Sequence, residues 1–289
     1  MKQVRLSDHA TDMADQARRE RESRNASLVA AYEAKVAEKE KRLEEMSKRR
    51  IRAWKEGRYL SWLGQGLHFI WAASGGHPDQ PQLEGRTQEE AAWSAGSDGE
   101  AEVARFLASR LSDEWTLIGG YRNGGGEIDY VLVGPAGLIT IEVKFRNAAV
   151  TIIGDRWTAD KYDRYGNHVE RNVPMVDRGG RSPARQLNEP TNRLVAFLRK
   201  ELPGIDAMRV VVLTHERSRL ESVSQPTAIP VVLGQWPLLD MFKLSPCRLT
   251  PEDRERVIAL IRRDHEFNIR RRGTGGACSV ENREQRRAG

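Results

Sequence analysis

The chain has few cysteines, no regular histidine motif and no long apolar run. Cys247 and Cys278 are its only cysteines. The second lies close to the C-terminus, so we expect no structural disulfide and a reducing cytoplasm. The six histidines show no pairing at the spacing of metal ligands, and there is no Cys-x-x-Cys pair. This pattern argues against a zinc site.

No segment is suited to cross a membrane. Tyr59–Ala73 is the most apolar stretch, but glycine, glutamine and histidine interrupt it, and a span needs about 20 largely apolar residues. Met1–Ala10 contains no apolar core of a signal peptide. We therefore expect a cytoplasmic protein without a membrane partner, in which Tyr59–Ala73 packs on a core domain.

Positive charge is concentrated at the two ends of the 289-residue chain. Residues 1–58 carry 16 Lys and Arg against 11 Asp and Glu, and residues 262–289 carry 8 against 4. The residues between them hold 23 basic and 26 acidic side chains. Because phosphate contacts need Lys and Arg, the ends are expected to bind nucleic acid. The alternative is that these charged ends are merely solvated.

The N-terminal segment is expected to be one long helix from Asp15 to Lys55, since it contains no proline or glycine. Apolar residues fall at heptad positions, with Lys39 interrupting the seam, so a coiled coil or a homodimer through this helix is an alternative to packing on the core. The segment also carries a candidate strip for phosphate contacts, made of Lys48, Arg49, Arg50 and Arg52.

Two apolar segments, Ile128–Val133 and Leu138–Val143, are joined by a four-residue turn and predict a β-hairpin. In a regular hairpin Val133 opposes Leu138, which places Asp129 opposite Glu142 and Lys144 on the same face. Alternation predicts Ile128, Tyr130 and Leu132 on one face and Val131 and Val133 beside Asp129 on the other. Both faces are largely apolar, which is typical of a buried strand.

Two buried carboxylates that face each other repel unless a cation lies between them or one takes up a proton. Asp129, Glu142 and the carbonyl of Val143 offer the oxygen ligands that Mg²⁺ or Mn²⁺ prefers. Lys144 would then assist the attacking water. The alternative for Glu142 and Lys144 alone is a salt bridge at a strand end.

The run from Gly126 to Lys144, Gly-Glu-Ile-Asp-Tyr-Val-Leu-Val-Gly-Pro-Ala-Gly-Leu-Ile-Thr-Ile-Glu-Val-Lys, resembles the nuclease-related domain, NERD. That family is grouped with the PD-(D/E)XK restriction-endonuclease-like superfamily. The resemblance extends from about Ala95 to about Val232. It implies an acidic residue on a preceding helix, matched by Glu100, and a glutamine that faces the site, matched by Gln186. Where family members commonly continue into an aromatic residue and a glycine, this chain has Phe145 and Arg146.

Local sequence patterns also predict helices and further strands before and after this hairpin. Ser97 and Glu100 have the spacing of a capping box, which would make Glu100 structural rather than a metal-site residue. Ser182 followed by Pro183 predicts the start of a helix that carries Gln186. A hairpin-like segment is expected at Val150–Trp157, and two strands at Arg209–Thr214 and Ile229–Leu233.

These patterns predict an α/β fold, a restriction-endonuclease-like mixed sheet flanked by helices with a long N-terminal helical extension. The expected parts are a basic helical extension (1–58), a docking segment and linker (59–94), a nuclease domain (95–245), a C-terminal helix (246–272) and a disordered basic tail (273–289). Arg146, Arg181 and Arg185 are further candidates for contacting nucleic acid.

The predicted function is metal-dependent hydrolysis of nucleic-acid phosphodiesters, with DNA favoured over RNA. Asp129, Glu142 and Lys144 are the main catalytic candidates, and Glu100 and Gln186 are of second rank. The alternative is a catalytically silent protein of nuclease fold that binds nucleic acid or joins partners through its helical arm.

Overall fold

The computed structural model describes residues 1–74, 76, 78–163, 165–224, 229–242, 245 and 248–285, and within these it leaves out the side chains of residues 9, 10 and 272–285. The chain divides into two compact units. We call residues 1–12 together with residues 92–289 the core unit, and residues 13–91 the arm unit.

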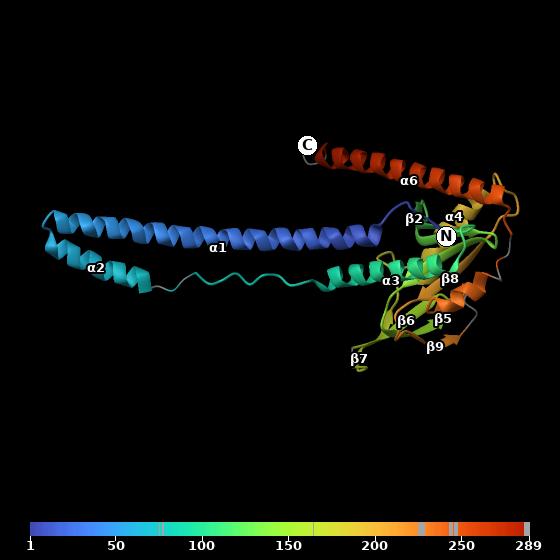
Figure 1. Cartoon of the computed structure of the whole chain (residues 1–289), viewed down its shortest axis with the longest axis horizontal. Coiled ribbons are helices and arrows are strands. Elements are labelled where there is room, and N and C mark those ends of the chain that lie inside the picture. The colour runs from blue at the N-terminus through green and yellow to red at the C-terminus, as the bar shows by residue number, and fades with distance from the viewer. Residues whose placement is uncertain are drawn as a thin grey trace. The chain divides into compact units, whose positions relative to one another are not determined.

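The core unit is built on a six-stranded mixed sheet (Figure 1). Its strand order is β1-β2-β3-β4-β8-β10. The central strands β2, β3 and β4 pair antiparallel, whereas β1, β8 and β10 join their neighbours in parallel. The strands are β1 (Lys2–Arg5), β2 (Thr116–Asn123), β3 (Gly126–Gly134), β4 (Gly137–Lys144), β8 (Ala207–Leu213) and β10 (Val231–Leu233). The predicted mixed α/β architecture is confirmed.

Helices cover both faces of this sheet. One face packs on α4 (Pro183–Leu198) and α6 (Pro251–Gln285), which contribute buried residues such as Leu187 and Ile261. The other face packs on α3 (Gln88–Arg110) and the short α5 (Trp236–Met241), through residues such as Leu107 and Leu238. Burial of apolar side chains on both faces is the expected main source of stability, at about 25 cal/mol per Å².

A second, four-stranded sheet has the order β7-β6-β5-β9. Its strands are β5 (Ala148–Ile153), β6 (Arg156–Tyr162), β7 (His168–Pro174) and β9 (Arg219–Ser224). The predicted hairpin-like segment is present as β5 and β6. Val150, Ile152 and Trp157 bury their side chains in the same cluster as α4, so the second sheet shares the α4 side of the core.

The C-terminal helix departs from the expected boundaries. α6 begins at Pro251 and continues to Gln285, through most of the segment expected to be disordered. Once a helix has formed, each added residue gains one backbone hydrogen bond, so the helix can continue where no apolar face exists. Residues 246, 247 and 286–289 lie outside the described residues.

The arm unit contains α1 (His9–Lys55) and α2 (Tyr59–Ser74). The predicted N-terminal helix is therefore confirmed, and it begins six residues earlier than Asp15. The structure places Tyr59–Ala73 within α2, in the same unit as α1, and the expectation that this segment packs on the core domain stays a prediction. The Trp62 ring lies 5.1 Å from that of Trp54, and the Arg50 guanidinium lies 5.7 Å from both the Trp62 and the Phe69 rings.

Ion pairs hold the start of α3 and the preceding segment to α1 within the arm unit. Arg21 lies 3.0 Å from Glu90, and Arg24 lies 2.8 Å from Glu84. Among the described residues, no helix combines the length and apolar character that crossing a membrane requires.

Candidate nuclease site

The β3–β4 hairpin has the predicted register. Val133 pairs with Leu138, and regular pairing continues to Tyr130 and Ile141. The next position along this register would place Asp129 opposite Glu142. At this position the Asp129 side chain, rather than its backbone, bonds to β4: its Oδ2 accepts a 2.7 Å hydrogen bond from the backbone N–H of Val143. The Asp129 carboxylate is thus held against β4, next to Glu142.

The pairing between β2 and β3 is interrupted at this point. Gly119 pairs with Tyr130 and Tyr121 with Ile128, whereas Gly120 and Asp129 are omitted. Gly120 has φ of +66°, and a Cβ atom there would lie 2.1 Å from the carbonyl oxygen of Ser7. Glycine is therefore required where the strand deviates.

The predicted side-chain alternation of β3 was wrong at Ile128. Ile128 was expected on the face of Tyr130 and Leu132, but it is buried in the cluster that contains Val131 and Val133. Tyr130 and Leu132 belong to the opposite cluster, beside α3. One residue is omitted on each strand and the register continues unchanged, but the side chains before and after Asp129 follow different alternations.

Lys144 lies between the carboxylate of Glu142 and helix α4. Its Nζ is 2.6 Å from Oε1 of Glu142 and donates a 3.0 Å hydrogen bond to Oε1 of Gln186. The Glu142 side chain is only 5% exposed and that of Lys144 is 23% exposed. The salt bridge expected as the structural alternative is present, and Asp129 and Gln186 complete a larger group around it.

The start of α4 positions Gln186. Ser182 is the N-cap, its side chain accepts a hydrogen bond from the N–H of Arg185, and Pro183 follows as the first helical residue. The predicted helix start is confirmed. Nε2 of Gln186 donates to the carbonyl oxygen of Arg181 at 2.8 Å, which leaves its Oε1 directed at Lys144.

The predicted capping box at Ser97 and Glu100 was wrong. Helix α3 begins nine residues earlier at Gln88, and Oγ1 of Thr87 accepts the hydrogen bond from the N–H of Glu90. Ser97 lies inside the helix, where its hydroxyl is 2.8 Å from that of Thr11. The same Thr-x-x-Glu spacing at Thr87 and Glu90 was the correct signal. Glu100 therefore has no capping function.

Glu100 approaches the hairpin from α3. The hydroxyl of Tyr130 donates a 3.0 Å hydrogen bond to the Glu100 carbonyl oxygen. At the neighbouring Gly99 a Cβ atom would lie 2.8 Å from that of Phe145, so glycine permits close contact between α3 and the segment after β4. Burial raises the pKa of the Glu100 carboxyl to about 7, with Arg5 opposing the shift and Glu127 and Glu142 adding to it.

Burial raises the pKa of Asp129 well above its usual range, and the negative charges of Glu142 and Glu100 raise it further. Burial alone would lower the pKa of Lys144, but Glu142 and Asp129 outweigh it and hold that pKa above its ordinary value. The Lys144 ammonium thus acts on the carboxyl groups of Glu142 and Asp129, and the Glu100 carboxyl adds negative charge nearby. With Asp129 ionised the site would carry an excess of buried negative charge, which a bound divalent cation would stabilise.

The donor set for a metal is small. Within the described part of the chain, no group of three or more His, Cys, Asp and Glu side chains is arranged to hold a metal ion. Asp129 and Glu142 fit a hard divalent cation as a pair, with a backbone carbonyl such as that of Val143 and water completing the coordination. This arrangement suits Mg²⁺, which usually retains several waters and one or two carboxylates.

The basic residues predicted to contact nucleic acid differ in whether they already form ion pairs or hydrogen bonds within the protein. Arg181 binds Asp177 at 2.7 Å and the Gly125 carbonyl oxygen at 2.9 Å, so it braces the loop before α4. Arg185 is 3.2 Å from Glu189 and its side chain is 54% exposed. Arg146 lies close enough to oppose the charge of Lys144. The four remaining candidates, Lys48, Arg49, Arg50 and Arg52, belong to the arm unit.

The contribution of the N-terminal strand to the sheet was not predicted from the sequence. β1 pairs with β2 in parallel, from Lys2 with Thr116 to Arg5 with Gly119. The positive charge of Arg5 lowers the pKa of Glu100 from 95 positions away. A four-residue strand whose partner is so distant leaves no periodic signal that local pattern analysis can detect.

The hairpin, the acidic residue on α3 and the Lys–Gln pair are the features on which the resemblance was based. Residues 95–214 match the family model of the nuclease-related domain, NERD. The NERD domain thus contains Glu100, Asp129, Glu142, Lys144 and Gln186, together with the second sheet up to β7. No curated protein and no solved structure matches the chain.

Proposed function

We propose that the NERD domain hydrolyses phosphodiester bonds of nucleic acid, with DNA as the favoured substrate, and that it requires Mg²⁺ or Mn²⁺. The observation that carries this proposal is the convergence of Asp129, Glu142 and Lys144 at the end of one hairpin. The match to a nuclease-related family supports the reaction class.

Asp129, Glu142 and the carbonyl of Val143 would hold the cation. When bound there, a divalent cation would polarise the phosphodiester and make a nearby water more acidic. Without it, Asp129 is a buried carboxyl group that favours its protonated form, because burial and Glu142 disfavour the charge. Occupation of the site by a cation would favour the ionised form of Asp129.

Lys144 would act on the substrate. Its ammonium has three donors, and the contacts to Glu142 and Gln186 fix its direction while leaving one donor for a phosphate oxygen or the attacking water. A fixed positive charge next to the phosphate stabilises the negative charge that grows in the transition state. Gln186 is a positioning residue, since it reaches the substrate only through Lys144.

Exposed basic groups beside this site would orient the phosphate backbone. Arg146 and Arg185 are suited to this role, while Arg181 is engaged with Asp177 and Glu189 and would contribute mainly by holding the loop. Because the core between the basic ends is slightly acidic in sequence, we expect the core alone to bind nucleic acid weakly and with a shallow salt dependence.

The test is cleavage of labelled single- and double-stranded DNA and RNA with Mg²⁺ or Mn²⁺. The intact protein is compared with Asp129→Asn and with Glu255→Gln, which removes an exposed carboxylate of α6. Metal-dependent cutting that Asp129→Asn abolishes and Glu255→Gln retains supports the proposal. Metal and nucleic-acid binding without cutting of any substrate would favour the alternative, a catalytically silent binding protein.

A further inference from the structure

Helix α2 presents a row of large apolar side chains to solvent. Five of them are exposed by more than half: Leu60 (88%), Leu63 (56%), Leu67 (73%), Ile70 (62%) and Trp71 (71%). At 100° per residue, these positions fall on one side of the helix within about a quarter of its circumference. We call these five residues the α2 stripe.

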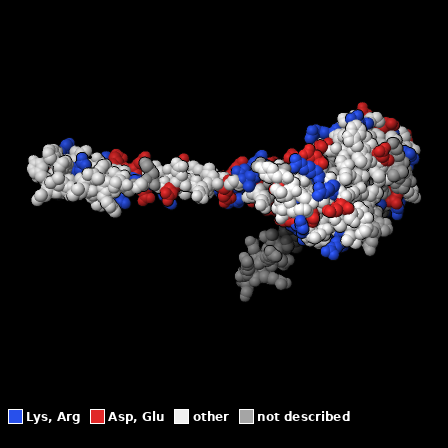
Figure 2. Space-filling view, turned by 90° about the horizontal axis from the view of Figure 1, so that it is seen from below, with Lys and Arg blue, Asp and Glu red and all other residues white. Residues whose placement is uncertain are grey.

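Another side of α2 packs on α1, and Trp71 of the stripe also borders α1 at a pocket near the end of α2. Trp62 and Phe69 lie on the side that packs on α1, both within 5.7 Å of the Arg50 guanidinium, and both are partly shielded. A helix that packs on one partner normally turns a polar face to water. Figure 2 shows part of the arm as a largely uncharged surface with isolated basic groups. The α2 stripe is therefore an apolar surface left over after the arm has folded.

The residues around the stripe are basic and aromatic. From Gly57 to Pro78 the sequence contains no Asp or Glu, and residues 47–58 contain six Lys and Arg against one Glu. Ile51 and Trp54 on α1 are each 53% exposed, and Tyr59 is 58% exposed. Exposed Trp, Tyr and Leu next to Lys and Arg are typical of helices that lie in the surface of an anionic membrane.

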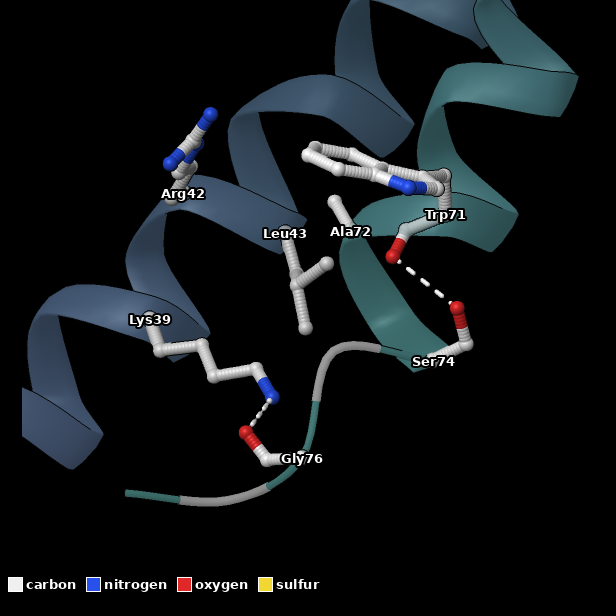
Figure 3. Close-up of a pocket in the computed structure, with 7 residues that line it drawn as sticks. All are labelled: Lys39, Arg42, Leu43, Trp71, Ala72, Ser74 and Gly76. Atoms are coloured by element: carbon white, nitrogen blue, oxygen red, sulfur yellow. Dashed lines mark hydrogen bonds between the residues drawn. The ribbon is translucent and has the colours of Figure 1, made fainter.

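A pocket of about 510 Å³ opens beside the far end of α2. Figure 3 shows Lys39, Arg42 and Leu43 of α1 on one side and Trp71 and Ala72 of α2 on the other. Nζ of Lys39 donates a 2.9 Å hydrogen bond to the carbonyl oxygen of Gly76. Two cations therefore meet an apolar wall, which suits a phosphate group with an attached acyl chain.

We propose that the arm unit docks on the surface of a membrane containing anionic phospholipid, with the α2 stripe among the acyl chains. Lys39, Arg42 and the basic residues of 47–58 then contact headgroup phosphates. Lying in the interface needs no spanning helix, so the finding that no described helix could cross a membrane is compatible with this. The proposal departs from the expectation of no membrane partner and does not depend on the nuclease reaction.

Two other occupants fit less well. In an isologous dimer the stripe would meet its own copy, and the cations at both ends of α2 would then approach other cations, which is unfavourable. Phosphates of a nucleic acid would pair with Lys48, Arg49, Arg50 and Arg52, but the apolar stripe would remain exposed to water. A lipid surface accounts for both the charge and the apolar residues.

The experiment is flotation of the full chain with vesicles, either pure phosphatidylcholine or phosphatidylcholine with phosphatidylglycerol. Leu63→Gln with Leu67→Gln removes apolar area from the stripe without changing charge. Ser61→Gln with His68→Gln is the matched control, on exposed positions of α2 outside the stripe. Circular dichroism checks that both retain the helix content of the unmodified chain. Arg49→Gln with Arg52→Gln tests the cationic contribution.

We expect binding to anionic vesicles, weaker binding to neutral ones, and weakening by salt. The stripe variant should bind at least about tenfold more weakly and the control unchanged. The Arg49 and Arg52 variant should lose about thirtyfold. No flotation of the intact chain, or equal flotation of the stripe variant, would overturn the proposal. So would a dimer, seen by light scattering, that the stripe variant dissociates while vesicles remain unbound.

Discussion

The backbone N–H of Val143 donates a 2.7 Å hydrogen bond to Oδ2 of Asp129, 14 residues earlier in the chain. This bond places an acidic side chain where a regular hairpin would use a backbone acceptor. It keeps the Asp129 carboxylate beside Glu142 despite their mutual repulsion. The candidate site is therefore built into the end of the hairpin and does not depend on a flexible loop.

Asp129→Asn should abolish metal-dependent cleavage without unfolding the protein. The amide oxygen of asparagine can still accept the Val143 hydrogen bond, but the charge for a cation is lost. Because burial and Glu142 raise the pKa of Asp129, the ionised form costs stability at neutral pH, and the variant without metal should be at least as stable as the original.

Thermal unfolding with and without Mg²⁺ checks this prediction. A ligand at a hundredfold excess over its Kd stabilises by about 2.7 kcal/mol, so Mg²⁺ should raise the Tm of the original chain by several degrees and leave Asp129→Asn unchanged. Glu255→Gln should respond to Mg²⁺ as the original does. An equal Mg²⁺ shift in Asp129→Asn would place the metal elsewhere.

Lys144→Ala should abolish cleavage while metal and nucleic-acid binding persist, because Lys144 is proposed to orient the attacking water and to stabilise the charge of the transition state. Gln186→Ala should lower kcat by about tenfold with little change in KM, since it only directs Lys144. Asn188→Ala removes an amide from the same helix and is the matched control. Full activity of Lys144→Ala would contradict the mechanism.

Gly120→Ala should destabilise the core unit by about 2 kcal/mol or more, through both positive φ and the contact with Ser7. Gly166→Ala separates these causes, because Gly166 has φ of +88° but no atom within 4 Å of an added Cβ. It should cost about 1 kcal/mol. Urea unfolding of the two variants measures the difference, and equal losses would rule out the steric contribution at Gly120.

The contribution of His265 to stability should fall as the pH is lowered from 7 towards 5, whereas the raised pKa values of Glu100 and Asp129 act in the opposite direction. Burial lowers the pKa of His265, and its Nδ1 accepts a 3.1 Å hydrogen bond from the N–H of Arg122, which requires the unprotonated atom. The unfolded chain binds a proton near pH 6.5, above the folded pKa, so stability present above that pH is lost below it.

His265→Gln should weaken this pH dependence, although it lowers stability at pH 7.5 by removing a buried contact. The measurement is the free energy of unfolding at several pH values for both chains. His215, which is partly exposed in the loop after β8, provides the control as His215→Gln. Parallel curves for the His265 variant and the original would show that another group titrates.

Several features could be predicted because they depend on neighbouring residues. The turn from Gly134 to Gly137 sets the hairpin register, and Ser182 with Pro183 sets the start of α4. Where two local signals competed, as for Thr87 and Ser97, the pattern alone favoured the wrong cap. A capping spacing recurs by chance inside helices, and only the surrounding chain decides which residue ends the helix.

Local patterns were enough to predict the hairpin, the closeness of Asp129 to Glu142, the long N-terminal helix and the start of α4 at Ser182 and Pro183. Turn geometry and side-chain periodicity act over a few residues and are visible in one sequence. Three further features come from the folded chain: the charge of Arg5 acts on Glu100, the pairing of β2 with β3 is interrupted at Gly120 beside Asp129, and α2 packs on α1. These contacts join distant segments, so they depend on the burial and pairing of the whole chain rather than on any local pattern.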